Sequence, residues 1–325
     1  MNSNQMNMDI RLALYRSMLR IRRVEEAVAK RYIEQEMRCP MHLCIGQEAI
    51  AVGICGALVN NDMMFSNHRA HGHYLAKGGN LNAMIAELYG RSTGCCGGRG
   101  GSMHLIDTDV GFMGATPIVG GTVPLAVGSA WAAALKGENR VCVVFFGDGC
   151  FEEGVVHESM NFASLHRLPV LFVCENNEFS VYTRLAERQP DRSIYRVAEA
   201  HGVTAYAGDG NDVEAVLAIA LTAVDKARQG MGPQFIELKT YRWREHCGPN
   251  FDDDLEYRSA PEIENGLNDC PVAWMEKCLA QSNPNFSTEN NRFEVEISEE
   301  IARAFDFALA SSKPSIKDAG ERLYA

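Results

Sequence analysis

The sequence predicts an α/β fold, a doubly wound and mainly parallel sheet with helices on both faces. Two short apolar runs, "VCVVFF" at 141–146 and "PVLFVC" at 169–174, are typical of strands that are covered on both sides. Residues 151–167 between them have the pattern of a helix, so the three segments form a strand–helix–strand unit with a right-handed crossover. The same alternation returns further along the chain, as expected for a doubly wound sheet.

The first third of the chain predicts helices and a long loop. Apolar residues at helical spacing predict an amphipathic helix over 9–36, and the small apolar residues of 47–59 indicate a buried helix. A short helix is expected over 81–89, ending at Gly90. Residues 90–121 are rich in glycine, so we expect loop rather than a regular element there.

The remaining segments continue the alternation of helices and strands. A buried helix is expected over 123–136, and strands over 203–208 and 234–241 flank a helix over 212–229. The stretch "DDDLEYRSAPEIENG" that follows is typical of a polar loop, and residues 295–310 have the pattern of another helix.

Composition limits the class of protein. The chain has 325 residues, 46% of them hydrophobic and 22% charged, which is enough to build a large globular core. A net charge of −11 argues against nucleic acid or an anionic membrane surface as the main partner. The 11 cysteines show no spacing typical of a disulfide framework, no signal peptide is recognisable, and no apolar run is long enough to span a membrane. We therefore expect a cytoplasmic protein with reduced thiols.

We expect one domain over residues 1–325. A helical extension at about 1–40 would precede the sheet, and a helical tail at about 260–325 would follow it.

The motif "FFGDGC" places a carboxylate at the end of a predicted buried strand. Asp148 lies between Gly147 and Gly149, and Asn177 ends the next predicted parallel strand after "ENN". Carboxylate and amide oxygens from neighbouring strand ends suit a hard cation such as Mg²⁺, whose remaining ligands would include phosphate oxygens. The two glycines would let a diphosphate approach the backbone closely.

A purely structural interpretation is also available for this motif. Asp148 could cap the following helix, and Asn177 could form a turn. The spacing between the two strand ends favours the metal site. A second "GDG" at 208–210 has no amide at the matching distance, so we interpret Asp209 as a turn residue and Asp212 as a helix-start residue.

At this point the chain resembles a known family, the α subunits of two-subunit thiamine-diphosphate-dependent 2-oxoacid dehydrogenases and acetoin dehydrogenases. The resemblance extends from about residue 10 to residue 260 and includes several independent motifs in the same order. The matching stretches are "HLCIGQEAIAVG" (42–53), "HRAHGHYLAKG" (68–78), "GGRGGSMHL" (97–105), "PIVGGTVPLAVG" (117–128), "FGDGCFEEGVVHESMNFASLHRLPVLFVCENN" (146–177) and "TYRW" (240–243).

The resemblance implies a magnesium site and part of a diphosphate site around the "GDG" motif. Asp148 and the Asn177 side chain would bind Mg²⁺, with the backbone carbonyl of Phe179 as a third protein ligand. Gly149 and Cys150 would offer backbone amides to the diphosphate.

The resemblance also implies roles for one arginine and three histidines. Arg69 falls at the diphosphate-binding arginine of the family, and His68 replaces the tyrosine that usually precedes it. His71 aligns with a histidine near the reaction centre. His246 aligns with a histidine on a mobile loop that closes over the cofactor.

Some other positions match the family pattern, and some depart from it. Val119 would contact the aminopyrimidine side of the cofactor, with Pro117 at a position that is usually glycine. Glu153 replaces a glutamine that contacts phosphate in some relatives, and a carboxylate there would repel a diphosphate unless it turns away or pairs with a cation. The loop at 244–259 lacks the usual H-x-H-S pattern, and Cys247 stands where some relatives carry a phosphorylated serine.

The resemblance implies an enzyme that binds thiamine diphosphate and Mg²⁺, cleaves a 2-oxoacid or acetoin as its small-molecule substrate, and passes the acyl unit to a lipoyl group on a transacylase. The glutamate that assists the cofactor in this family comes from a separate β subunit, so an α2β2 assembly is expected. The alternative is a transketolase- or acyloin-type carboligase that uses a sugar or aldehyde acceptor. A non-catalytic thiamine-diphosphate-binding subunit is a third interpretation.

Some other residues are expected to be structural. His42 and His104 would serve structure or an interface, and "EEAVAK" at 25–30 would lie on a solvated helix face. The adjacent Cys95 and Cys96 cannot easily chelate one zinc ion together, and no second pair has zinc spacing.

Overall fold

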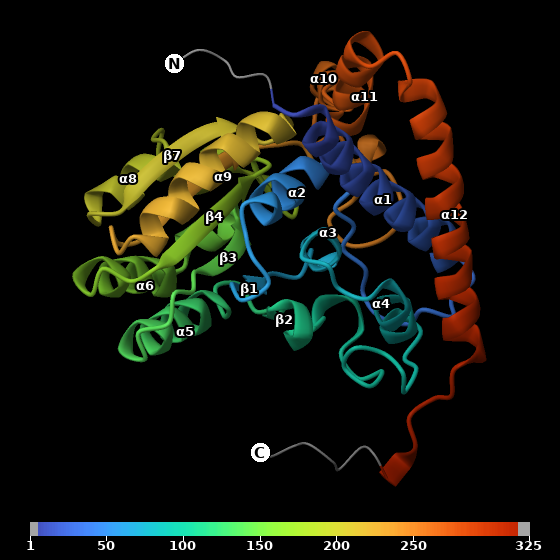
Figure 1. Ribbon diagram of the computed structural model, residues 1–325, viewed down its shortest axis with the longest axis horizontal. Helices are drawn as coiled ribbons and strands as arrows, with labels where there is room; N and C mark the ends of the chain where they lie inside the picture. The colour runs from blue at the N-terminus through green and yellow to red at the C-terminus, as the bar shows by residue number, and fades with distance from the viewer. Residues whose placement is uncertain (1–5, 318–325) are drawn as a thin grey trace.

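A computed structural model describes residues 6–317 of the chain. Within this range the main sheet has six parallel strands in the order β2-β1-β3-β4-β8-β7, and a short antiparallel hairpin joins β5 to β6 (Figure 1). The strands are β1 Met63–Ser66, β2 Phe112–Ala115, β3 Cys142–Gly147, β4 Val170–Asn176, β5 Phe179–Ser180, β6 Thr183–Arg184, β7 Thr204–Asp209 and β8 Gln234–Lys239.

Helices cover both faces of this sheet (Figure 1). The α-helices in the described range are α1 Met8–Tyr32, α2 Glu48–Gly56, α3 His71–Ala76, α4 Leu81–Leu88, α5 Val123–Leu135, α6 Gly154–Leu165, α7 Leu185–Arg188, α8 Ile194–Ala200, α9 Val213–Arg228, α10 Ala260–Asn268, α11 Pro271–Ser282 and α12 Phe286–Ala310. One face packs on α5, α6 and α8, and the other on α2 and α9 with the remaining N- and C-terminal helices.

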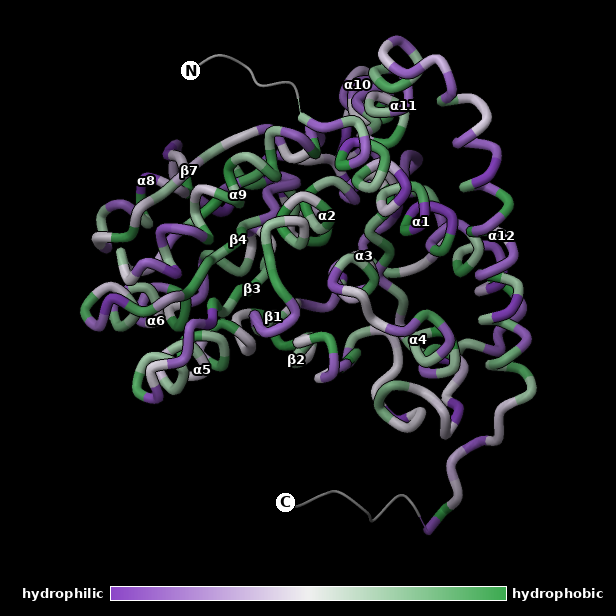
Figure 2. The backbone as a smooth tube through the Cα atoms, viewed as in Figure 1, coloured by the Kyte–Doolittle hydropathy of each residue, from purple (hydrophilic) through white to green (hydrophobic). Residues whose placement is uncertain are grey.

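The two cores arise from the alternation of side chains along buried strands. In β3, Val143 and Phe145 enter the core on the α9 side, whereas Val144 and Phe146 enter the core on the α5 and α6 side. Both sets are apolar because neither face of the strand meets water. The tube coloured by hydropathy accordingly shows β3 and β4 as hydrophobic segments inside the molecule (Figure 2). The predicted doubly wound α/β fold is confirmed.

The structure corrects three expectations about local elements. The glycine-rich region 90–121 was expected to be loop, but it contains the edge strand β2 and two short 3₁₀ turns. The stretch expected to be a polar loop contributes α10, which begins at a Ser259 capping box closed by Glu262. The last long helix begins at Phe286, well before residue 295. The strand β1 was missed because four residues carry too little periodicity to recognise.

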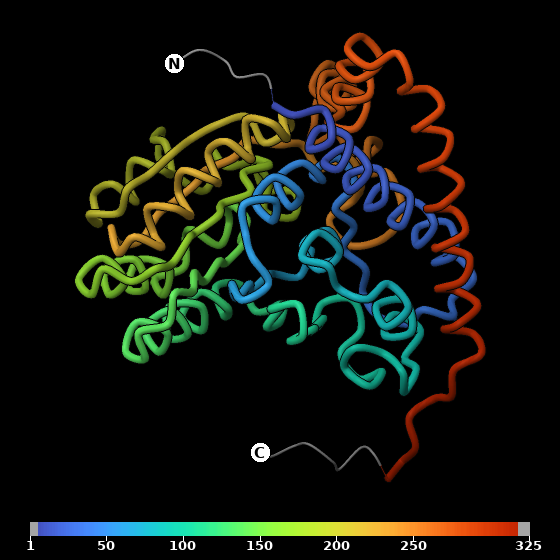
Figure 3. Tube along the Cα trace, in the orientation of Figure 1, coloured from blue at the N-terminus to red at the C-terminus, as the bar shows by residue number. Residues whose placement is uncertain are grey.

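The N- and C-terminal helices pack against one another beside the sheet. Figure 3 shows α1 in blue next to α12 in red along one side of the molecule. Ion pairs join Arg16 to Glu296 at 3.2 Å and Arg20 to Glu300 at 2.7 Å. The expected helical extension and tail thus include α1 and α12, whereas residues 1–5 and 318–325 lie outside the described residues.

One residue of "EEAVAK" does not lie on a solvated face. Glu25 is fully buried and accepts hydrogen bonds from the backbone amide of Cys44 at 3.0 Å and from the Cys44 thiol. Its other oxygen pairs with Nδ1 of His71 at 3.0 Å. Local sequence predicted the helix correctly. The residues that bury Glu25, however, are Cys44 and His71, which lie 19 and 46 positions further along the chain.

The carboxyl ends of the strands converge at one edge of the sheet. The chain passes from β1 to the outer strand β2 and then returns to β3 on the other side of β1, so the direction of winding reverses beside β1. Ligands bind at such reversal points in open α/β sheets. Among the described residues, none of the helices combines the length and apolar character that crossing a membrane requires.

A buried ion pair connects two helices near this edge. Arg22 of α1 donates to Glu48 of α2 at 2.6 and 3.0 Å, and both side chains are almost completely buried. Glu48 also accepts from the backbone amide of Gly46, and the Arg22 guanidinium lies 4.3 Å from the ring centre of Trp243.

We expect Arg22→Met to lower the free energy of unfolding by about 3–5 kcal/mol, because Glu48 would remain buried without its partner. The Arg22→Met/Glu48→Met double variant should recover most of this loss. The matched control is Arg16→Met in the exposed pair with Glu296, which should cost less than about 1 kcal/mol. Denaturant unfolding followed by circular dichroism measures all three. Equal losses for Arg22→Met and Arg16→Met would contradict the assignment.

Candidate functional site

A cavity of about 210 Å³ lies at the carboxyl edge of the sheet. Its walls come from the segments that follow four strands and from the loop after β8. The predicted site residues among its lining are His68 and Arg69 after β1, Pro117 and Val119 after β2, Gly147, Asp148, Gly149 and Cys150 at the end of β3, Asn177 and Phe179 after β4, and His246. Two predicted site residues, His71 and Glu153, are not part of the lining.

Asp148 is almost completely buried at the end of β3. Its carboxylate forms an ion pair with Arg188 of α7, and its backbone carbonyl accepts from the Gln189 side chain at 3.3 Å. Burial raises the pKa of Asp148 above its ordinary value even though hydrogen bonding and the charge of Arg188 act in the opposite direction. The guanidinium therefore compensates the buried charge only in part.

Asn177 and Phe179 lie next to Asp148 because β3 and β4 are parallel neighbours. The register pairs Gly147 with Glu175, which places the residues after both strands at the same edge. The Asn177 side-chain oxygen accepts from the amide of Phe179 at 3.2 Å, and its amide group donates to Gln47 at 3.0 Å. An amide oxygen has two lone pairs, so it retains one acceptor position.

The backbone after Asp148 approaches the β5–β6 hairpin closely. A side chain at Gly149 would lie 2.8 Å from the hydroxyl of Ser180, so this contact requires glycine. Cys150 is buried, and burial raises the pKa of its thiol to about 12. Glu153 is exposed and is not part of the cavity lining.

Arg69 contributes a buried positive charge on the opposite wall. Its guanidinium donates to the backbone carbonyls of Leu43 and His246, and it forms no ion pair with any residue that the structure describes. Burial, reinforced by the nearby charge of Arg242, lowers the pKa of Arg69 to about 10. A buried guanidinium without a carboxylate partner is costly, so this wall is suited to an anion.

Three histidines form a cluster beside Arg69. The ring centres of His42, His68 and His246 are 4.7–5.2 Å apart. Burial, and then the charge of Arg69, lowers their pKa values to about 3, 2 and 4 respectively, so all three rings are neutral at neutral pH. Nδ1 of His42 is buried and has no hydrogen-bond partner among the residues that the structure describes.

His71 lies behind the cavity wall rather than in it. The side chain is fully buried at the start of α3, where Nδ1 contacts Glu25 at 3.0 Å and Nε2 contacts the hydroxyl of Ser102 at 2.8 Å. Both ring nitrogens are therefore occupied by protein groups. Despite burial, hydrogen bonding and the charge of His71 hold the pKa of Glu25 below its ordinary value. This geometry offers His71 no direct contact with a ligand in the cavity.

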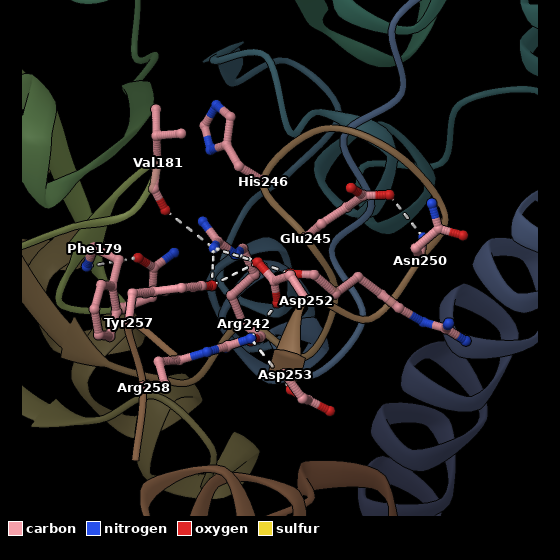
Figure 4. A network of polar contacts seen from close by, with 12 residues as sticks. Phe179, Val181, Arg242, Glu245, His246, Asn250, Asp252, Asp253, Tyr257 and Arg258 are labelled. Carbon is pink, nitrogen blue, oxygen red and sulfur yellow. Dashed lines mark hydrogen bonds and ion pairs between the residues drawn. The ribbon is translucent and has the colours of Figure 1, made fainter. Parts of the chain in front are cut away.

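A buried polar network anchors the divergent loop after β8. Arg242 and Arg258 converge on Asp252, and Tyr257 donates to the same carboxylate at 2.6 Å (Figure 4). All three charged side chains are nearly inaccessible to solvent. His246 projects from this loop away from the network, so the anchored base of the loop supports it at the cavity.

Sequence reasoning missed several residues that line the cavity. Gln47, Glu175 and Arg242 are among them, although each lies within or beside a motif that the resemblance had matched. Within residues 6–317, the buried side-chain nitrogen of Gln47 has no hydrogen-bond partner. Arg188 was also missed, because nothing in its local sequence indicates that α7 folds back onto Asp148.

Comparison with known proteins shows the family of this chain. The sequence profile of the dehydrogenase E1 component family matches residues 16–317. The chain is 39% identical over 310 residues to the α subunit of acetoin:2,6-dichlorophenolindophenol oxidoreductase from Bacillus subtilis, covering 93% of this chain and 90% of that protein. It is 35% identical to the pyruvate dehydrogenase E1 component subunit α of Porphyra purpurea, covering 100% of this chain and 96% of that protein.

A mammalian relative shows the same relationship. The chain is 33% identical to the somatic, mitochondrial pyruvate dehydrogenase E1 component subunit α of Rattus norvegicus, covering 97% of this chain and 79% of that protein. Both the profile and the relatives extend over nearly the whole chain. The resemblance seen in the sequence is confirmed, and the protein belongs to the dehydrogenase E1 component family.

Proposed function

We propose that this chain is the α subunit of a thiamine-diphosphate-dependent enzyme that cleaves a 2-oxoacid or acetoin and passes the acyl unit to a lipoyl acceptor. The observation that carries this proposal is the pair of buried charges that face one cavity. Arg69 has no carboxylate partner, and Asp148 is only partly compensated. A divalent cation bound to a diphosphate matches this pair, because its anionic oxygens suit Arg69 and its metal suits Asp148.

The residues around Asp148 fit a magnesium ion. The carboxylate of Asp148, the side-chain oxygen of Asn177 and the backbone carbonyl of Phe179 are all hard oxygen donors from one edge of the sheet. We propose these three as the protein ligands, with Gly147 and Gly149 allowing a diphosphate to approach the backbone. The backbone amides of Gly149 and Cys150 would donate to phosphate oxygens.

Arg69 and the histidines beside it would also contact the anionic end of the cofactor. Arg69 would pair with the diphosphate, and the neutral rings of His68 and His246 could each donate one N–H. Val119 would contact the aminopyrimidine side, with Pro117 shaping the same wall. When bound, thiamine diphosphate supplies the electron sink for carbon–carbon cleavage.

We propose two different contributions for the two histidines assigned to catalysis. His246 lines the cavity with a neutral ring, so it can donate or accept a proton at a substrate atom. His71 would act as a positioning residue, since its contacts with Glu25 and Ser102 hold α3 behind Arg69.

The surface of α5 supports the proposed β subunit as partner. This helix carries no charged residue from Val123 to Leu135, yet Leu125, Trp131 and Leu135 are 57%, 42% and 73% exposed. Ile118 is also exposed just before the helix, next to the cavity. Apolar surface of this kind marks a protein interface. We propose that the β subunit covers it and completes the cofactor site in an α2β2 assembly.

All 11 cysteines are free thiols in the structure, which supports a reducing compartment such as the cytoplasm.

The alternative is a carboligase with the same cofactor and another acceptor. The loop after β8 supports this alternative, because it lacks the usual H-x-H-S pattern and would face the acceptor. An assay in which the assembled enzyme is given either a lipoyl protein or an aldehyde as acceptor distinguishes the two functions. Acylation of the lipoyl group supports the dehydrogenase, and ligation to the aldehyde supports the alternative.

We expect Asp148→Asn to weaken Mg²⁺-dependent binding of thiamine diphosphate by at least about 100-fold, since losing a metal's outer hydrogen-bond partners alone costs ~10–100-fold. Asp209→Asn is the control, because Asp209 accepts from the amide of Asn211 in a turn. Tryptophan fluorescence of the assembled enzyme follows cofactor binding. Full Mg²⁺ dependence in Asp148→Asn, with catalysis retained, would favour the interpretation as a non-catalytic subunit.

We expect the isolated chain to be inactive and the assembly with a β subunit to be active. Leu125→Asp should weaken that assembly, because it puts a charge on the apolar face of α5. Val295→Asp on α12 is the matched control, since Val295 and Leu125 are 58% and 57% exposed. Size-exclusion chromatography with light scattering reports the assembly. Robust turnover by the chain alone would refute the proposed partner.

The histidine cluster makes the folded chain sensitive to acid. Because the folded-state pKa values of His42, His68 and His246 lie below the ordinary value of 6.5, the unfolded chain binds more protons in the window from 6.5 down to about 4. Stability is therefore fully present above this window and is lost as pH falls through it. Arg69, Arg242 and the buried Asp252 contribute the neighbouring charges.

We expect His68→Tyr to reduce the loss of melting temperature between about pH 7 and about pH 5, because one buried titrating ring is removed. His166→Tyr, at an exposed position after α6, should leave the pH dependence close to that of the natural chain. Thermal unfolding by circular dichroism measures both. An unchanged pH dependence in His68→Tyr would contradict the assignment.

A further inference from the structure

Arg188 holds the carboxylate that the proposed function assigns to the metal. One guanidinium nitrogen contacts Asp148 and another contacts Glu152, so the side chain bridges two carboxylates. Its third nitrogen donates to the backbone carbonyl of Thr183 at 3.1 Å. The side chain is only 10% exposed, and the neighbouring Gln189 donates to the same carboxylate, Glu152, at 3.0 Å.

The segment that carries Arg188 also carries a proposed metal ligand. Phe179 begins the β5–β6 hairpin, and α7 follows the hairpin directly. The amide of Leu185 donates to the carbonyl of Glu178 at 2.7 Å, which closes this segment on itself. Glu178 and Val181 have φ values of 65° and 56°, a conformation that is unfavourable for residues with side chains. Contacts at the end of the segment, including those of Arg188, must hold it in this shape.

A guanidinium and a divalent cation that share one buried carboxylate repel each other, because the site has little water to screen their charges. Glu152 offers Arg188 a second partner, and its side chain is 35% exposed, whereas that of Asp148 is 1% exposed. If Arg188 releases Asp148, it can therefore keep its ion pair with Glu152.

We propose that Arg188 is an internal counter-ion of the metal site, which partly compensates Asp148 in the metal-free chain and shifts to Glu152 when a divalent cation binds. Metal and guanidinium then compete for one carboxylate, and Arg188 sets the concentration of cation at which the site fills. This inference rests on the metal site of the proposed function.

The competition predicts a gain of affinity, which a merely structural role would not produce. In Arg188→Met, the full-length chain should bind Mn²⁺ roughly tenfold more tightly than the natural chain, because the cation no longer displaces a buried partner. The metal-free variant should also melt at a lower temperature, and added Mn²⁺ should raise its melting temperature by more than in the natural chain. Loss of the free Mn²⁺ signal in electron paramagnetic resonance measures the affinity without any activity assay.

The matched control is Arg184→Met in the same hairpin. Arg184 pairs with Glu262 at 2.8 Å and contacts neither Asp148 nor Glu152. Its guanidinium lies 4.8 Å from the ring centre of Phe179, whose backbone carbonyl, not its ring, is the proposed ligand. It should leave Mn²⁺ affinity unchanged. Arg188→Lys retains the positive charge without the bridging fork, so its affinity should lie between those of the natural chain and Arg188→Met. This variant also provides a test if Arg188→Met folds poorly.

Asp148→Asn separates failure of this inference from failure of the proposed site. If Asp148→Asn abolishes Mn²⁺ binding while Arg188→Met and Arg188→Lys bind as the natural chain does or more weakly, the counter-ion role is wrong and the metal site stands. If Asp148→Asn binds Mn²⁺ unchanged, or if the natural chain binds none, the metal site itself is wrong and the counter-ion role fails with it.

Discussion

In a parallel sheet every strand delivers its carboxyl end to the same edge, and in this chain that edge receives buried charges of both signs. Asp148 enters from the end of β3, and Arg69 enters from the segment after β1. Neither charge is fully compensated within the described chain. A protein retains such an arrangement only at some expense of stability, so it is more informative about function than any apolar contact of the fold.

The residues around Arg69 and Asp148 orient both side chains without fully neutralising their charges. Arg69 is held by backbone carbonyls, which orient the guanidinium without neutralising it. The histidines beside it remain neutral because burial and the charge of Arg69 both oppose their protonation. At the end of β3, Arg188 of the short helix α7 partly compensates the charge of Asp148.

Membership of the dehydrogenase E1 component family and the geometry of the site rest on different grounds. The family relationship extends over almost the whole chain, including helices that do not touch the cavity. The geometry separates His246, which lines the cavity, from His71, which does not. It also identifies an uncharged, exposed helix, α5, as surface that is unsuited to water. A subunit that needs a partner accounts for that surface.

The sequence by itself determined the class of fold and the position of Asp148. Short continuous apolar runs bounded by glycine are typical of strands buried on both faces, and the 29 positions from Asp148 to Asn177 match the length of one helix and one strand. Short elements such as β1, and polar segments such as α10, carried too little local pattern to be assigned correctly. Contacts between distant segments were decided only by the tertiary structure. The burial of Glu25, the return of Arg188 onto Asp148 and the exposure of α5 depend on which surfaces meet when the chain closes, and local periodicity holds no information about that.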